Sequence, residues 1–212
     1  MDYTMADLTP SERYRLIVNT VTPRPIAWVV TQGKDGTRNC APFSFFNALG
    51  DDPPLIVLGL MANHATGDAK DTARLIRETG EFTIALVGEA DGEAMNLTAI
   101  DAPPGIDELE LARIATLPSL LITPPRIASA PVSFECRTWQ IIDAGPRSTV
   151  VLGEIVAMHI DDAFLIPGAA GRPPRIDTPA MKLIGRQHGA GMYVRNSDSF
   201  EMKRVSWPLP DD

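Results

Sequence analysis

The chain has 212 residues, of which 44% are hydrophobic, so it can bury a substantial core and does not have the composition of a disordered protein. The formal net charge of -8 argues against binding of nucleic acid or of an acidic membrane surface, because the overall field repels both. The length predicts a single domain over residues 1–212, with a core in about residues 22–160 and an irregular C-terminal wrap in residues 161–212.

The first predicted element is a helix that starts with a capping box. Thr9 and Glu12 have the required spacing, and Pro10 stands at the first turn. The apolar spacing that follows predicts that this helix ends near Val21.

Strand signals dominate the next part of the chain. Residues 26–31 are β-branched and aromatic with apolar side chains on both faces, which predicts a strand buried on two sides. The glycines of Gly33-Lys34-Asp35-Gly36 suit a hairpin turn, so we expect the segment from Thr37 to return antiparallel. Further strands are predicted at residues 55–60, 81–87, 131–143 and 148–159, a helix at residues 68–79, and two short helices within residues 89–115.

These elements define the expected fold class. Six or so antiparallel strands with helices inserted between them lack the regular alternation of a doubly wound sheet. We therefore predict a mainly β fold, a closed or split β-barrel with peripheral helices.

Location is predicted from two absences in the sequence. No apolar run approaches the about 18 to 20 residues of a membrane span, and the first residues lack a signal-peptide core. Cys40 and Cys136 lie in separate strand-like runs without CxxC spacing, which is typical of buried thiols in a reducing compartment. The expectation is a cytoplasmic protein with no membrane partner.

Several common kinds of site have no motif in this chain. There is no GxGxxG after a strand and no P-loop. His64, His159 and His188 are too scattered for a His-x-x-x-His metal site, so no metal is expected. A Ser-His-Asp triad stays open, without a G-x-S-x-G elbow to support it.

Residues 39–47 combine polar, small and aromatic side chains. A flat aromatic cofactor such as an isoalloxazine ring needs amide and backbone donors at its edge, apolar groups on its faces and short side chains for close approach. The candidates are Asn39, Ala41, Ser44 and Asn47 for the edge, and Phe45 or Phe46 for the apolar side. The alternative is that both phenylalanines belong to the core and that Ser44 and Asn47 only satisfy a turn.

A phosphate site is predicted at the next helix start. Lys70, Asp71 and Thr72 open this helix, where free N–H groups and the helix dipole favour an anion. The alternative is an ordinary capped helix with a solvated Lys70. Arg24 is a second candidate cation, held between Pro23 and Pro25, although a role at the strand entry is equally open.

An ordered set of short motifs carries a family resemblance. The set comprises Arg24-Pro25-Ile26-Ala27-Trp28-Val29, Asn39-x-Ala41-Pro42-Phe43-Ser44-Phe45-Phe46-Asn47, Asp52-Pro53-Pro54, Lys70-Asp71-Thr72, Gly80-Glu81-Phe82, Met95-Asn96 and Phe134-Glu135-Cys136. In this order the motifs resemble those of the flavin reductase-like proteins with an FMN-binding split barrel, which include flavoredoxins. The segment from Arg186 to Tyr193 looks like the glycine-rich stretch before a tyrosine near the end of such proteins.

The resemblance implies a Greek-key split barrel, a homodimer and one FMN per subunit near the dimer interface. The strand containing Pro25, Ala27 and Trp28, together with residues 39–47, would line the isoalloxazine ring. Lys70, Asp71 and Thr72 would lie at the phosphate, and Arg24 at the edge of the cofactor.

The main functional hypothesis is an FMN-dependent oxidoreductase of flavin reductase type. It would pass hydride from NAD(P)H to flavin and on to free flavin or another acceptor, with no catalytic side chain assigned because this step needs no general base. One alternative is a flavin-binding electron carrier without its own nicotinamide site. Another is a barrel binding module without flavin.

Overall fold

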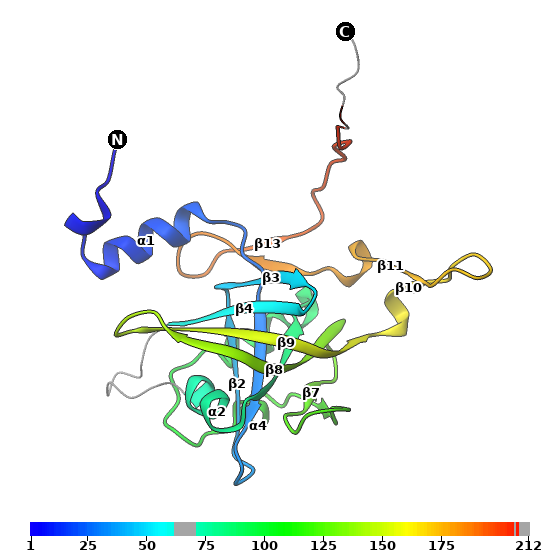
Figure 1. The fold of residues 1–212 in the computed structure, drawn as a ribbon, viewed down its shortest axis with the longest axis horizontal. Helices are drawn as coiled ribbons and strands as arrows, with labels where there is room; N and C mark the ends of the chain where they lie inside the picture. Colours follow the sequence, from blue (N-terminus) through cyan, green and yellow to red (C-terminus); the bar gives the residue numbers. More distant parts are fainter. Residues whose placement is uncertain (62–70, 206, 208–212) are drawn as a thin grey trace.

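A computed structural model describes residues 1–61, 71–205 and 207 of the chain (Figure 1). Its main feature is an antiparallel sheet of seven strands in the order β2-β1-β5-β8-β9-β4-β3. The strands are β1 (Ala27–Gln32), β2 (Arg38–Phe43), β3 (Phe46–Asp51), β4 (Pro54–Met61), β5 (Glu81–Leu86), β8 (Val132–Asp143) and β9 (Ser148–Ile160). The mainly β, antiparallel architecture predicted from the sequence is confirmed.

The two edges of this sheet are joined by a very short connection. The edge strands β2 and β3 follow one another in the chain, with only Ser44 and Phe45 between them. A sheet whose edges are two residues apart must curl until these edges meet, which closes it into a barrel. We call the junction of the two edges, at Ser44 and Phe45, the seam. The Gly59 N–H, on β4, donates to the Phe45 carbonyl at 2.7 Å and stabilises the seam.

Strand β1 is buried on both faces, as its apolar run predicts. Val29 and Ala27 point into one core cluster, with Leu58, Phe82 and Val151. Trp28, Val30 and Ile26 belong to a second cluster, with Cys40, Ala85, Val87, Met95, Leu109 and Ile127. The strand therefore separates two apolar cores, because alternate side chains of a strand face opposite sides.

The helices cover the barrel from outside. The capping box of α1 (Pro10–Thr20) is present, since the Glu12 N–H donates to Thr9 Oγ1 at 3.3 Å and the Thr9 N–H donates to Glu12 Oε2 at 2.9 Å. The helix α2 (Asp71–Thr79) ends before Gly80, which has a φ of +72°; its predicted start near residue 68 lies outside the described residues. The two short predicted helices are α3 (Gly92–Leu97) and α4 (Glu108–Leu111).

Other short elements were not predicted. The strand β3 is mostly exposed and contains a glycine, so it has no apolar alternation to reveal it. The remaining pieces are η1 (Met5–Asp7), η2 (Glu89–Asp91), β6 (Thr116–Leu117), β7 (Arg126–Ile127), η3 (Asp162–Phe164), β10 (Leu165–Ile166), β11 (Arg175–Ile176), η4 (Pro179–Met181), β12 (Ile184–Arg186) and β13 (Tyr193–Arg195).

The C-terminal part contains short paired strands. The hairpin β12–β13 is attached to the barrel by bridges between Arg24 and Arg186 and between Gly88 and Leu183. Pairing with the rest of the barrel stabilises these three-residue strands, which their local sequence does not predict.

A buried carboxylate anchors the loop between β6 and β7 to the barrel. Glu135 is fully buried, and its oxygens accept from the Leu120 and Leu121 N–H groups at 2.7 Å each. His159 Nε2 lies 2.6 Å from Glu135 Oε1. Burial alone would raise the pKa of Glu135, but these hydrogen bonds outweigh it and leave the pKa below its ordinary value.

This network makes the stability of the fold sensitive to acid. A lowered folded-state pKa means that Glu135 contributes stability above its unfolded-state pKa of about 4.3, and that this contribution is lost as the pH falls through the lower folded value. We expect Glu135→Gln to lower the free energy of unfolding at pH 7 and to flatten its decline in acid, as measured by urea unfolding. Glu201→Gln, at an exposed position, is the control. Parallel pH curves for Glu135→Gln and the natural protein would contradict the assignment.

Candidate functional site

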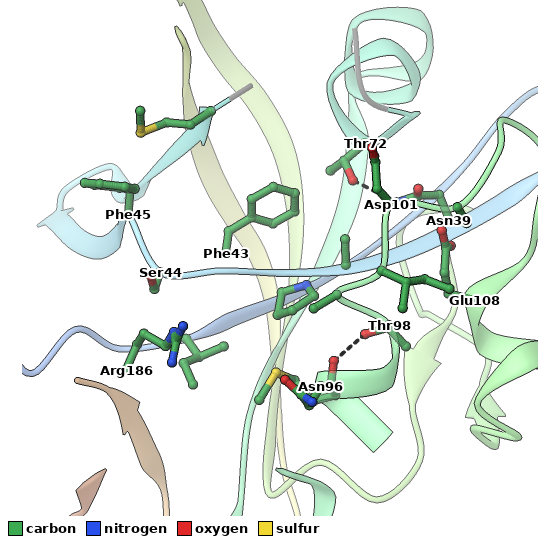
Figure 2. Close-up of a pocket in the computed structure, with 18 of the residues that line it drawn as sticks. Asn39, Phe43, Ser44, Phe45, Thr72, Asn96, Thr98, Asp101, Glu108 and Arg186 are labelled. Carbon is green, nitrogen blue, oxygen red and sulfur yellow. Dashed lines mark hydrogen bonds between the residues drawn. The ribbon is translucent and has the colours of Figure 1, made fainter. Parts of the chain in front are cut away.

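A pocket of about 330 Å³ opens at the barrel seam (Figure 2). One wall is formed by β2 and by Ser44 and Phe45, and the opposite wall by residues 95–102, at the end of α3 and beyond it. Ile26 and Met95, both from the second core cluster, also line the pocket. The pocket therefore lies where the chain leaves one sheet edge for the other.

The β2 wall is apolar and suits a flat group. Ala41, Pro42 and Phe43 present short or flat side chains, and Ala99 also lines the pocket. A Cβ at Gly59 would lie 2.9 Å from the Cβ of Phe45, so the glycine is what allows Phe45 to sit against β4. Small and apolar side chains of this kind permit close approach to a planar ligand.

Polar side chains gather at one end of the pocket. In Figure 2, Asn39, Thr72, Asp101 and Glu108 lie together, opposite Phe45 and Arg186. The Asn39 Nδ2 group donates to Thr72 Oγ1 at 2.7 Å, which links β2 to the first turn of α2. This end therefore offers amide, hydroxyl and carboxyl groups to a ligand.

Two carboxylates at this end already have partners. Asp71 Oδ1 lies 2.8 Å from an Arg74 guanidinium nitrogen, so its charge is largely compensated. Glu108 Oε2 accepts from the Cys40 N–H at 2.9 Å. Burial raises the pKa of Glu108, because the charged form loses its hydration.

Arg24 ties three segments together from a buried position. One of its terminal nitrogens donates to the carbonyls of Val18 and Val21 at 2.7 Å each, which caps the C-terminal end of α1. Its Nε donates to Ser44 Oγ at 3.3 Å, and its other terminal nitrogen donates to the Gln187 carbonyl at 3.4 Å. The guanidinium thus joins α1, the seam and the segment after β12.

The turn between β12 and β13 closes the opposite end. Arg186 donates to the carbonyls of Ala190 at 2.5 Å and Met192 at 3.1 Å, and its guanidinium carbon lies 4.8 Å from the Tyr193 ring centroid. Arg186, Ala190 and Tyr193 all line the pocket. The C-terminal stretch that carried part of the resemblance is therefore located at the site.

The structure brings six of the predicted cofactor contacts to this pocket. Asn39, Ala41, Ser44, Phe45, Asp71 and Thr72 all line it. Lys70 lies outside the described residues. Direct contact of any of these residues with a cofactor stays a prediction.

The other predicted contacts lie outside the pocket lining. Ala27 and Phe46 belong to the first core cluster, and Trp28 is buried in the second, where its Nε1 donates to Thr98 Oγ1 at 2.9 Å. Pro25 and Asn47 are exposed, and Asn47 Oδ1 accepts from the Ala48 N–H. Arg24 is the buried clamp described above.

Sequence reasoning did not assign the wall at residues 95–102. Asn96, Thr98 and Asp101 line the pocket from this wall. Thr98 Oγ1 donates to the Met95 carbonyl at 2.8 Å while it accepts from Trp28, so a core tryptophan fixes the wall. The pair Met95-Asn96 could have indicated this wall in the sequence, because it belongs to the motifs that carried the resemblance.

Residues 1–61, 71–205 and 207 contain no group of three or more His, Cys, Asp or Glu side chains placed to hold a metal ion. No helix within these residues is long and apolar enough to span a membrane.

The chain belongs to the flavin reductase like domain family, whose sequence model matches residues 19–167. An uncharacterized protein of Deinococcus radiodurans is 39% identical over 215 residues, which cover 98% of this chain and 92% of the relative. Nitrilotriacetate monooxygenase component B of Bacillus cereus has a similar structure, with a TM-score of 0.86, 30% identity and coverage of 95% of this chain and 98% of that one.

A second similar structure is the 2-nitrobenzoate 2-nitroreductase NbaA of Pseudomonas fluorescens. Its TM-score is 0.86 and its identity 34%, with 100% of this chain and 99% of that one covered. The split-barrel fold is confirmed, because a solved Shewanella frigidimarina structure with a split barrel domain matches 98% of this chain with a TM-score of 0.76.

The Arg24 contacts predict a structural effect of its removal. Arg24→Met leaves the Val18 and Val21 carbonyls without their donor, which should cost about 1 to 3 kcal/mol of unfolding free energy. Hydrogen exchange of the α1 amides should accelerate at the same time. Arg15→Met, at an exposed position on the same helix, is the control. Weaker flavin binding with unchanged stability and unchanged α1 protection would instead identify Arg24 as a cofactor contact.

Proposed function

We propose that this protein is an FMN-dependent oxidoreductase of flavin reductase type. It receives hydride from NAD(P)H and delivers electrons to free flavin or to another acceptor. The observation that supports this most is the convergence of Asn39, Ala41, Ser44, Phe45, Asp71 and Thr72 on one pocket, in a chain of the flavin reductase like domain family.

The residues present fit a flavin. The wall of Ala41, Pro42 and Phe43 is flat enough to pack on an aromatic ring system, and the amides of Asn39 and Asn96 suit its polar edge. Asp71 and Thr72, in the first described turn of α2, line the pocket, and the first-turn N–H groups of a helix favour a phosphate. Asp71 does not strongly oppose a phosphate there, because Arg74 compensates its charge.

Bound FMN would supply the hydride-accepting ring, and the chain would supply geometry and electrostatics. Phe43 and Phe45 would shield one side of the bound ring from water. The amide of Asn39 is held in one orientation by Thr72, so its contribution needs little reorganisation. Hydride transfer requires no side chain that gains or loses a proton, which agrees with the lack of an assigned general base.

A nitroaromatic acceptor is a second candidate. The solved protein named 2-nitrobenzoate 2-nitroreductase is 34% identical to this chain over its whole length. Reduced flavin in the same pocket would then pass its electrons to a nitro group instead of free flavin.

We also infer a homodimer in the cytoplasm. Phe200, Met202, Val205 and Trp207 are between 67% and 87% exposed, on a segment that leads away from the barrel in Figure 1. Apolar side chains this exposed on an extended segment favour contact with a second protein surface.

The function is tested by anaerobic reduction of the flavin-loaded protein. NADH or NADPH should bleach the bound flavin faster than free FMN, and 2-nitrobenzoate should then restore the colour. Added free flavin should instead lose its own colour, because excess nucleotide reduces it through the bound flavin. Flavin binding without bleaching by either nucleotide would favour the electron carrier. A colourless protein that takes up no FMN on titration would leave only the hypothesis of a barrel binding module without flavin.

The position of the phosphate is tested by comparing FMN with riboflavin, which lacks it. Lys70→Gln should weaken FMN by about tenfold or more and leave riboflavin unchanged, because only a phosphate contact is lost. Thr72→Val should weaken both ligands, because it also removes the acceptor that orients the Asn39 amide. Arg186→Gln, at the opposite end of the pocket, is the matched variant and should change the two ligands equally. Loss of FMN preference in Arg186→Gln alone would place the phosphate at the other end.

A further inference from the structure

A second and larger hollow lies beside the flavin pocket. It measures about 770 Å³ and lies between α1 and the turn that joins β8 to β9. Tyr14, Ile17, Phe45 and Met61 give it an apolar and aromatic lining, and Arg13 and Arg147 stand at its surface. We call it the α1 groove.

The α1 groove and the flavin pocket share a boundary. Tyr14, Phe45 and Met61 line both of them. The Tyr14 and Phe45 rings form a tilted pair with centroids 6.4 Å apart. In Figure 2, Phe45 stands at the end of the flavin pocket away from Asn39 and Glu108. The groove and the flavin pocket therefore adjoin at this aromatic pair.

The two arginines, Arg13 and Arg147, lack an ion-pair partner in the part of the chain that the structure describes. Arg13 Nε is moreover buried without a hydrogen-bond partner in the same part of the chain. A buried donor left without an acceptor is unfavourable. In a protein with a net charge of -8, two arginines that pair with no acidic group among the described residues make this groove a favourable place for an anion.

The lining and the arginines together define the class of ligand. Planar guanidinium groups bind phosphate oxygens in pairs, and the aromatic and aliphatic lining suits a base. A nucleotide diphosphate joined to an aromatic base has both parts. Its far end would extend past Tyr14 and Phe45 into the flavin pocket.

We propose that the α1 groove binds the adenosine diphosphate half of NAD(P)H, with Arg13 and Arg147 on its phosphates. The nicotinamide then enters the flavin pocket past Tyr14 and Phe45. This inference rests on the proposed function and adds to it the residues that select a dinucleotide as reductant.

The experiment compares NADH and NADPH with N-benzyl dihydronicotinamide, which carries the same reducing ring and no phosphate. In Arg13→Gln combined with Arg147→Gln, KM for both dinucleotides should rise about tenfold or more, because charge-assisted hydrogen bonds to phosphate are lost. The rate with the benzyl compound and the flavin content should not change. Arg13→Lys should recover part of the loss.

Arg15→Gln, on the exposed side of the same helix, is the matched control and should leave every rate unchanged. An equal loss with dinucleotides and with the benzyl compound would overturn the inference, because it would show a general effect on the flavin site. So would unchanged rates together with a change of oligomeric state in sedimentation, which would identify the groove as an interface between copies.

Calorimetry with ADP separates this inference from the proposed function. If no reductant bleaches the flavin, the proposed hydride transfer fails, while ADP binding that disappears in the double variant would still support the diphosphate site. No ADP binding by the natural protein would overturn the site whatever the outcome of the reduction assays.

Discussion

The structure depends on one covalent constraint, the two-residue connection between the edge strands of the sheet. Because Ser44 and Phe45 must take the chain from β2 to β3, the sheet has to curl until its two edges meet. The residues of the seam itself lie outside the regular strand pairing. Their side chains are therefore available to line a pocket, and the hydrogen bond between Gly59 and Phe45 keeps the seam in place.

The surroundings of the seam are fixed by buried polar contacts. Arg24 holds Ser44 to the end of α1 and to the segment after β12, and Asn39 holds β2 to α2. Trp28 performs the same task for the opposite wall through Thr98. Each contact joins segments that are far apart in sequence, so the pocket walls have defined positions before any ligand binds. Such preorganisation is what a cofactor-holding site requires.

Much of the fold could be predicted because the signals were local. The strands near residues 26–31 and 131–159 and the capping box at Thr9 follow from residue patterns over a few positions. The strand β3 and the hairpin β12–β13 could not be predicted in this way. Their residues are exposed or few, and pairing with the rest of the barrel is what makes them strands.

The site was predictable in the same uneven way. The composition of residues 39–47 indicated which segment meets a ligand, but not which side chains of that segment face it. Phe45 lines the pocket while the adjacent Phe46 enters the core, because successive side chains alternate between faces and the register depends on tertiary pairing. Likewise, the apolar run that contains Trp28 predicts that its side chains are buried, but it does not predict which residues they contact. The wall at residues 95–102 has no pattern of its own and could be recognised only from the resemblance.

The most direct test of the central claim is a crystal structure of the protein with FMN bound. The account predicts that the ring lies between residues 41–45 and residues 95–102, with the phosphate at the start of α2. A flavin bound elsewhere on the barrel, or a seam pocket filled by the protein's own side chains in that crystal, would contradict it.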